Sequence, residues 1–109
     1  MKAKTMPRHK YVGQLYKFVS KQKGSETSLE YYYAKDIAIT TGLDKNNRMF
    51  VRSDEPLAIG FLIKEIKDGA NNLILSDTIW QINSIQPVLD AFSNLQGYTM
   101  NAIKYQGTL

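Results

Sequence analysis

Apolar residues recur at every second position along most of this chain, and that is the spacing of a β-strand. The clearest case covers residues 28–41, where one face carries Leu29, Tyr31, Tyr33, Ile37 and Ile39, with Lys35 as an interruption. Successive residues of a strand point to opposite faces, so one face of such a segment packs inward while the other meets water. The pattern predicts that sheet, rather than helix, organises the fold.

Further strands are expected at residues 11–21, 49–51, 57–66, 73–75, 79–85 and 98–105. Turn-forming Gly, Asp, Asn, Ser and Pro residues separate them. Residues 86–97 fit either a short helix, from Pro87 to Gly97, or an irregular loop. Six or seven short strands with at most one short helix predict a mainly β fold. A small antiparallel β-barrel or sandwich is expected, because such a sheet must hide its edges.

The length of 109 residues fits one domain, predicted to cover residues 11–109 behind a flexible basic arm of residues 1–10. Trp80, Phe61 and Ile82 are assigned to the core. Cysteine is absent, so neither a disulfide nor a Cys-ligated zinc site can form. No apolar run follows the basic start and none approaches the length of a membrane span, so neither a secretory signal nor a membrane partner is expected.

Charge is distributed unevenly along the chain. Every ionisable side chain before Glu26, apart from His9 and the tyrosines, is basic: Lys2, Lys4, Arg8, Lys10, Lys17, Lys21 and Lys23. A basic N-terminal segment on a slightly acidic remainder of the chain indicates a negatively charged partner: nucleic acid, an acidic protein surface or a neighbouring copy of the chain. Lys2, Lys4, Arg8 and Lys10 are therefore predicted to dock a partner, the alternative being a disordered, solubilising tail.

Catalytic patterns are missing from the sequence. His9 is the only histidine and has no other ligands at metal-binding spacing, and no Ser-His-Asp set is credible around it. Gly60 and Gly69 belong to no phosphate-binding loop. The acidic pair Asp54-Glu55 precedes Pro56 and is typical of a solvated turn. We therefore expect no enzyme activity, catalytic residue, metal, cofactor or small-molecule substrate.

A family resemblance rests mainly on the second half of the chain. Its segments are Phe61-Leu-Ile-Lys-Glu-Ile, Asn72-Leu-Ile-Leu-Ser-Asp-Thr-Ile-Trp-Gln-Ile-Asn-Ser-Ile and Gly97-Tyr-Thr-Met-Asn-Ala-Ile-Lys. With the opening strand, Gly/Ser turn and long second strand, about two thirds of the chain resembles the head completion proteins of tailed phages, also called head–tail joining, stopper or connector proteins. The basic extension at residues 1–10 departs from that pattern, and residues 86–97 match it only loosely.

The resemblance implies a structural virion protein that is assembled in the host cytoplasm. Identical subunits of such a protein form a ring below the portal, meet portal or adaptor proteins on one side and the tail on the other, and surround a DNA channel. Loops at residues 42–47 and 67–72 would reach the lumen or a neighbour. The basic residues at and after the first loop, Lys45, Arg48 and Arg52, are assigned to that contact.

Two other functions remain open at this point. Basic residues interleaved with aromatic ones, as in Lys10-Tyr11 and Tyr16-Lys17-Phe18, also suit a small nucleic-acid-binding β-barrel. In that case Tyr31 and Tyr33 would form a stacking platform, whereas otherwise they pack within the sheet. A small inhibitor or adaptor that blocks a partner through an edge strand is the third hypothesis.

Overall fold

The computed structural model describes residues 9–43, 46, 48–70, 72–74 and 78–107. These residues form seven strands and no helix, which confirms the predicted mainly β class. The strands are β1 (Tyr11–Lys23), β2 (Glu26–Leu43), β3 (Met49–Ser53), β4 (Leu62–Lys67), β5 (Leu73–Ile74), β6 (Trp80–Leu89) and β7 (Leu95–Lys104).

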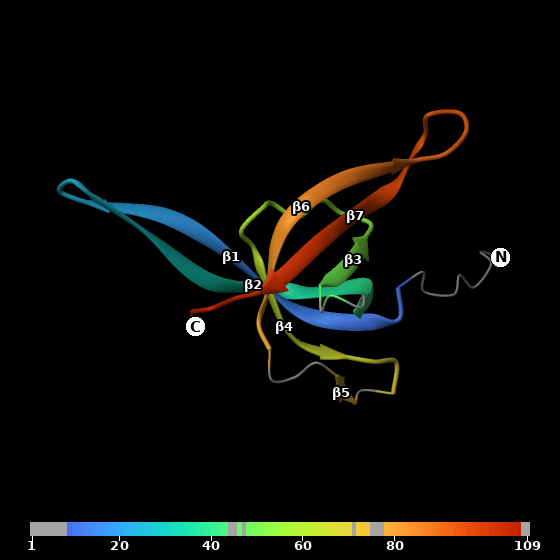
Figure 1. The fold of residues 1–109 in the computed structure, drawn as a ribbon, viewed down its shortest axis with the longest axis horizontal. Helices are drawn as coiled ribbons and strands as arrows, with labels where there is room; N and C mark the ends of the chain where they lie inside the picture. Colours follow the sequence, from blue (N-terminus) through green and yellow to red (C-terminus); the bar gives the residue numbers. More distant parts are fainter. Residues whose placement is uncertain (1–8, 44–45, 47, 71, 75–77, 108–109) are drawn as a thin grey trace.

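The strands join in one antiparallel sheet that closes on itself. Their order is β1-β2-β3-β7-β6-β4-β5, and an additional pairing between β1 and β4 completes a barrel-like ring (Figure 1). The strand β5 lies outside the ring, on the far part of β4. Closure hides the edges that an open sheet of this size would expose, which is the reason the sequence pattern favoured a barrel or sandwich.

Gly13 lies where β1 meets β4. A Cβ built on Gly13 would stand 2.7 Å from Ile63 Cγ2, closer than real Cβ atoms approach, and 3.3 Å from Ile66 Cγ1, a tight contact. The register also shifts here, because Val12 pairs with Lys67 and Gln14 with Lys64. Between these two pairs β4 has one residue more than β1. The extra β4 residue is accommodated at Glu65, whose φ of 51° lies in the left-handed region. A missing side chain and a bulge thus permit the closing contact.

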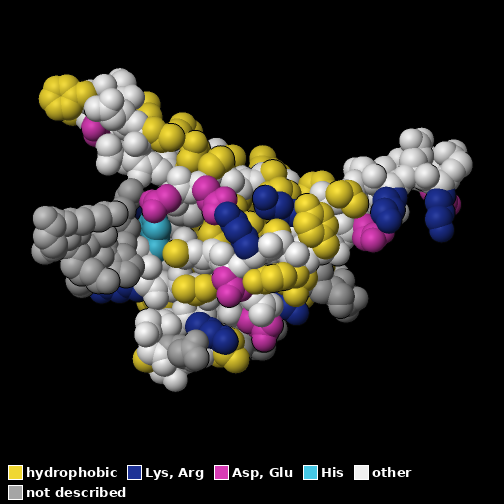
Figure 2. All heavy atoms as spheres, turned by 180° about the vertical axis from the view of Figure 1, so that it is seen from behind, with side chains coloured by type: hydrophobic (Ala, Val, Ile, Leu, Met, Phe, Trp, Pro, Cys, Tyr) yellow, Lys and Arg dark blue, Asp and Glu magenta, His cyan; other side chains and the backbone are white. Residues whose placement is uncertain are grey.

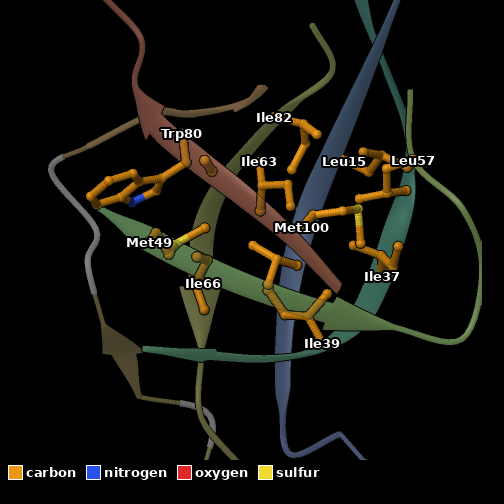
Figure 3. Close-up of a cluster of buried hydrophobic side chains, with 12 residues drawn as sticks. Leu15, Ile37, Ile39, Met49, Leu57, Ile63, Ile66, Trp80, Ile82 and Met100 are labelled. Atoms are coloured by element: carbon orange, nitrogen blue, oxygen red, sulfur yellow. The ribbon is translucent and has the colours of Figure 1, made fainter. Parts of the chain in front are cut away.

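Side chains from every strand of the ring fill its interior (Figure 3). Trp80 and Ile82 are buried as predicted, whereas Phe61 is half-buried and packs against the edge of the cluster. On β3 the alternation is complete, with Met49, Val51 and Ser53 buried and the residues between them exposed. The whole cluster comprises Leu15, Ile37, Ile39, Met49, Val51, Leu57, Ile63, Ile66, Trp80, Ile82, Met100 and Ala102.

Two hairpins extend beyond the ring. In the β1–β2 hairpin, the residues from Lys17 to Lys23 pair only with β2, because β4 reaches no further than Tyr16. In the β6–β7 hairpin, the ladder continues past the last partner of β3, at Tyr98, out to the pair Leu89 and Leu95. The hairpins project on different sides of the barrel (Figure 1), and the molecule is 56 Å long and 34 Å wide in the other two directions.

The structure corrects the helix interpretation of residues 86–97, since no helix is present, and the loop interpretation holds only for the turn at positions 90–94 within residues 86–97. These residues extend β6 to Leu89 and begin β7 at Leu95. Pro87 is tolerated because β4 pairs with β6 only at Trp80 and Gln81. At Pro87 the edge of β6 that faces away from β7 has no strand partner, so the missing N–H breaks no hydrogen bond there. The turn chemistry of Asp90 and Asn94 outweighs the helix-like apolar spacing.

The predicted strand at 57–66 is also shorter than expected, because β4 starts at Leu62. Gly60 adopts a φ of 99°, and the Phe61 N–H donates to the Ala58 carbonyl across a turn. The turn still belongs to the barrel wall, since the Gly60 N–H donates to the Ile82 carbonyl and the Ile82 N–H to that of Phe61.

Candidate assembly interface

The end of the β6–β7 hairpin is held by one carboxylate. Asp90 Oδ1 accepts hydrogen bonds from the backbone N–H groups of Phe92, at 2.8 Å, and Asn94, at 2.9 Å. Asp90 Oδ2 accepts from the side-chain amides of Asn94, at 3.4 Å, and Gln96, at 3.2 Å. The Asp90 N–H closes the turn on the Asn94 carbonyl at 3.0 Å. The loop therefore has a defined conformation although it stands in solvent.

These hydrogen bonds favour the ionised form of Asp90. The N–H of Asn94 and then that of Phe92 are the main causes that hold the pKa of this carboxyl below its ordinary value of 3.8. The charge is therefore present throughout the neutral range. No basic residue lies between Trp80 and Gly97, so the hairpin end carries a single negative charge.

The side chain that this loop presents is Phe92, which is 84% exposed. Val88, Leu89 and Leu95 near it are exposed as well. Figure 2 views the molecule from behind, and apolar side chains follow the β6–β7 hairpin to its end at the upper left. A group of exposed apolar side chains on one ordered hairpin is a feature that contact surfaces share, whereas a single exposed ring would need no explanation. We call residues 88–95 the apolar tip.

The turn between β4 and β5 has the same hydrogen-bond pattern. Asp68 Oδ1 accepts from the N–H groups of Ala70, at 2.9 Å, and Asn72, at 3.0 Å, and the Asp68 N–H donates to the Asn72 carbonyl at 2.9 Å. In both turns an Asp is followed four residues later by an Asn. The described residues next to Asp68 are the small Gly69 and Ala70, both exposed. Among its described residues this turn therefore exposes only small side chains there, whereas the turn of the β6–β7 hairpin exposes the phenyl ring of Phe92.

An open pocket lies beside this second turn. Its volume is about 510 Å³, and residues 9–12, Ala38 and residues 68–70 line it. The lining is mainly apolar, with Tyr11, Val12 and Ala38 among its residues, and Lys10 and Asp68 are its two charged residues. The size falls in the range of about 300–1,000 Å³ that suits a compact apolar group. We call this pocket the socket.

His9 anchors the chain immediately before β1. Its ring is nearly buried, with Nδ1 2.7 Å from Thr40 Oγ1 on β2 and Nε2 3.1 Å from Asp54 Oδ1 after β3. The sequence assigned His9 no partner. In the structure it ties the residue before β1 to β2 and to the segment after β3, and it also helps to line the socket.

The structure tests the placement of only some predicted contact residues. Lys2, Lys4, Arg8 and Lys45 lie outside the described residues. Lys10 is exposed at the socket, far along the chain from Arg48 and Arg52, which are exposed at the start and on the outer face of β3. The Arg52 guanidinium lies 5.9 Å from the Phe50 ring, so it packs against an aromatic face on the outside of the barrel.

The aromatic residues of the β1–β2 hairpin contact one another across the strands. Tyr31 meets Phe18 and Tyr105 in edge-to-face geometry, and its hydroxyl donates to the Gly60 carbonyl at 3.2 Å. Tyr33 meets Tyr16 in the same way and donates to Asp36 Oδ1 at 2.7 Å. That hydrogen bond is the main cause that raises the pKa of Tyr33 above 10.0. Both tyrosines therefore take part in packing within the sheet.

The outer end of the β1–β2 hairpin is polar, unlike the apolar tip. Lys21 Nζ lies 3.0 Å from Glu30 Oε2 across the strands, and Lys23 pairs in register with Glu26. Figure 2 shows this end on the right, with charged side chains of both signs. The ends of the two hairpins thus differ in character, one being charged and polar and the other apolar.

Two further features, a metal-binding cluster and a membrane-spanning helix, were searched for in the described part of the chain. None of its residues form a group of three or more His, Cys, Asp or Glu side chains suited to a metal ion. Over the same ranges, no helix has the length and apolar character needed to cross a bilayer. Comparison with known proteins gives no match to a family model, to a curated protein or to a solved structure.

Sequence reasoning missed the apolar tip and the socket. Residues 86–97 were interpreted as a short helix or a loop and residues 67–72 as a loop that reaches the lumen or a neighbour, so neither the exposed ring of Phe92 nor the pocket beside Gly69 was predicted. The signal that identifies both turns is the repeated spacing of Asp and Asn, at Asp68 with Asn72 and at Asp90 with Asn94. An Asp that accepts backbone N–H groups further along the chain is a recognised turn former, and here it marks both places.

Proposed function

We propose that this protein is a structural assembly subunit: a head–tail connector that forms a ring with copies of itself below the portal of a tailed phage. In that role it joins the portal or adaptor side of the capsid to the tail around the channel through which DNA passes. The observation that carries the proposal is the ordered, apolar tip on a hairpin that stands clear of a closed barrel.

The physical argument starts from what each part contributes. A closed barrel is a rigid body without free edges along its closed part, so it does not polymerise by indiscriminate strand pairing. Projecting hairpins then determine which neighbours it meets. Large exposed apolar side chains, among them Phe92, Leu89 and Leu95, supply contact area that only a partner can bury. A subunit that contacts its neighbours through different surfaces assembles into a closed ring when the rotation between copies closes.

The basic residues fit the same role. Arg48 and Arg52 are exposed on the side of the barrel formed by β3, where they would face a neighbour or the lumen. Lys2, Lys4, Arg8 and Lys10 would dock an acidic surface of the portal, adaptor or tail. These contacts require only a modest positive charge, since strong binding to phosphates would slow the passage of DNA.

The proposal is tested on tailed phage particles made from a genome that carries this chain. Density-purified particles should contain several copies of the protein, and deleting its coding sequence should leave DNA-filled heads that lack tails. Supplying the purified protein to those heads should restore tail attachment. Normal yields of tailed particles without the chain would contradict the proposal.

A second arm of the test addresses nucleic acid. A connector subunit should show no salt-sensitive affinity for short single-stranded DNA near physiological salt. A binding constant that falls steeply with salt, and that depends on Lys10, Arg48 and Arg52, would instead favour the nucleic-acid-binding barrel.

A further inference from the structure

We infer that the edge of β7 beside the end of β3 binds an extended acidic segment of a partner protein, with one carboxylate of that segment on Arg52. The inference rests on the proposed assembly function and names the chemistry of one neighbour: a strand-like, acidic segment on the portal, adaptor or tail side. Three features of the described residues carry it, namely an arginine without an acceptor, a hollow beside that arginine, and a sheet edge without a strand.

The guanidinium of Arg52 has no acceptor within the described part of the chain. It lies 5.9 Å from the Phe50 ring, and neither a hydrogen bond nor an ion pair joins it to another described residue. Contact with a ring face satisfies no hydrogen bond to oxygen, so the planar fork of N–H donors remains available to an outside group. Thr99 is the register partner of Arg52 on β7, so its hydroxyl lies on the same face.

A hollow of about 190 Å³ opens beside Arg52, which is the only permanently charged residue among the described residues that line it. His9 also lines the hollow, but its two ring nitrogens already face Thr40 Oγ1 and Asp54 Oδ1. Asp90 lies outside the lining and accepts the hydrogen bonds of its own turn. The volume is below the roughly 300 Å³ of a small-molecule site and suits one side-chain carboxylate.

The same hollow opens on an unpaired edge of β7. Strand β3 ends at Ser53, opposite Tyr98, so residues 95–97 of β7 have no strand on their β3 side. Figure 1 shows β7 continuing past the end of β3 toward the turn of the hairpin. The ladder between β7 and β6 also skips Gln96. An extended segment in line with β3 would therefore complete the sheet at this edge.

These features favour a polypeptide over a nucleic acid. A free strand edge pairs with another polypeptide backbone, whose N–H and C=O groups repeat at the spacing of the sheet. Nucleic acids are bound through several phosphates at once, whereas this hollow holds a single arginine. The guanidinium fork matches a planar carboxylate through two parallel hydrogen bonds. The partner is therefore an extended segment with an Asp or Glu side chain that reaches Arg52.

The test titrates a synthetic peptide into the full-length protein. The probe is a short peptide with blocked ends and alternating threonine and glutamate, because threonine favours an extended backbone. The matched probe has glutamine in place of each glutamate. Binding is measured from the amide resonances of Gln96 and Gly97 and from the fluorescence anisotropy of labelled peptide. We expect the acidic probe to shift both resonances with a dissociation constant below about 1 mM, and the neutral probe to bind more weakly.

Variants separate the arginine from net charge. Arg52→Gln should weaken binding of the acidic probe about 10- to 100-fold, as expected for the loss of hydrogen bonds to a charged group. The matched control, Lys23→Gln, removes the same charge at the exposed end of the β1–β2 hairpin and should change the affinity less than about twofold. Arg52→Lys keeps the charge without the fork, so most of the affinity should be lost. Because Arg52 is exposed, neither Arg52 variant should lower the melting temperature.

A modified probe tests the strand edge itself. Methylation of alternate backbone nitrogens leaves the charge of the acidic probe intact but removes the N–H groups that a strand needs. It should abolish the shifts at Gln96 and Gly97.

Three results would overturn the inference: no shift of these two resonances at millimolar probe, an affinity unchanged by Arg52→Gln, or equal binding of the methylated probe. Tighter binding of short single-stranded DNA at the same residues would also overturn it and assign the edge to nucleic acid. If particles need the chain for tail attachment while the probe fails to bind, the edge site is wrong and the proposed function stands. If the probe binds as expected but tails attach without the chain, the edge site stands and the connector function is wrong.

Discussion

A side chain at position 13 should weaken closure of the barrel, so Gly13→Ala is the most informative stability variant. The added Cβ would lie 2.7 Å from Ile63 Cγ2, on a β-branched side chain that is fully buried and cannot move aside freely. Overpacking of this kind costs about 1–3 kcal/mol. Alanine also lowers the conformational entropy of the unfolded chain, which offsets about 0.4–1 kcal/mol of this loss in stability. We expect a net destabilisation of about 1–2 kcal/mol.

Urea unfolding followed by circular dichroism measures this change, and thermal melting checks it. At this chain length a loss of that size corresponds to a melting temperature lower by about 4–12 °C. Gly69→Ala is the matched control, because its Cβ would meet nothing closer than the Lys10 carbonyl oxygen at 3.9 Å. The control should change the free energy of unfolding by less than about 0.5 kcal/mol.

A double-mutant cycle identifies the cause. Ile63→Ala removes the methyl group that the new Cβ would strike, so Gly13→Ala should cost clearly less in that background than in the native chain. If Gly13→Ala melts like the native protein, or if its cost is the same with and without Ile63, the account of barrel closure is wrong.

Three further predictions concern single side chains. Trp80→Ala should cost about 3–5 kcal/mol in urea unfolding, and Trp80→Phe less than half as much, because the buried indole N–H finds no acceptor among the described residues; equal costs would refute this. Hydrogen bonding keeps Asp90 ionised, so the amide resonance of Asn94 should change only as the pH falls below the ordinary carboxyl pKa of 3.8, and a change near that value or above would refute the hydrogen-bonded turn. Tyr33 should ionise above pH 10.0, and its stabilising hydrogen bond, present below that pH, should be lost as the pH rises through the raised pKa. In NMR titration Asp36→Asn should bring that pKa back down, and an unchanged value would exclude Asp36 as the cause.

The parts of the fold that could be predicted are those with period-two patterning. The inward residues of β3 alternate without interruption, and Trp80 and Ile82 lie on the buried face that the sequence assigned to them. Alternation works there because one face packs on the core and the other meets water. It fails at residues 57–61, where Gly60 breaks the strand with a positive φ although the apolar pattern continues.

The projecting hairpins could not be predicted in the same way. Outside the barrel neither face of a strand is buried, so the spacing of Val88, Leu89 and Phe92 no longer reports a strand and imitates a helix. The socket was equally hidden, since it is formed by β1, β2 and the β4–β5 turn, which meet only when the ring closes. The charge pattern predicted a negatively charged partner, but it gave no sign of the exposed apolar side chains at the hairpin end.

The most direct test of the central claim, self-assembly through the projecting hairpin, is light scattering on a sizing column. The protein should be run over a range of concentrations, at low and moderate salt, with and without short single-stranded DNA. The account predicts a mass that rises with protein concentration, falls back to one chain on Phe92→Ser and ignores DNA. A mass of one chain at every concentration, with a salt-sensitive increase when DNA is added, would contradict it.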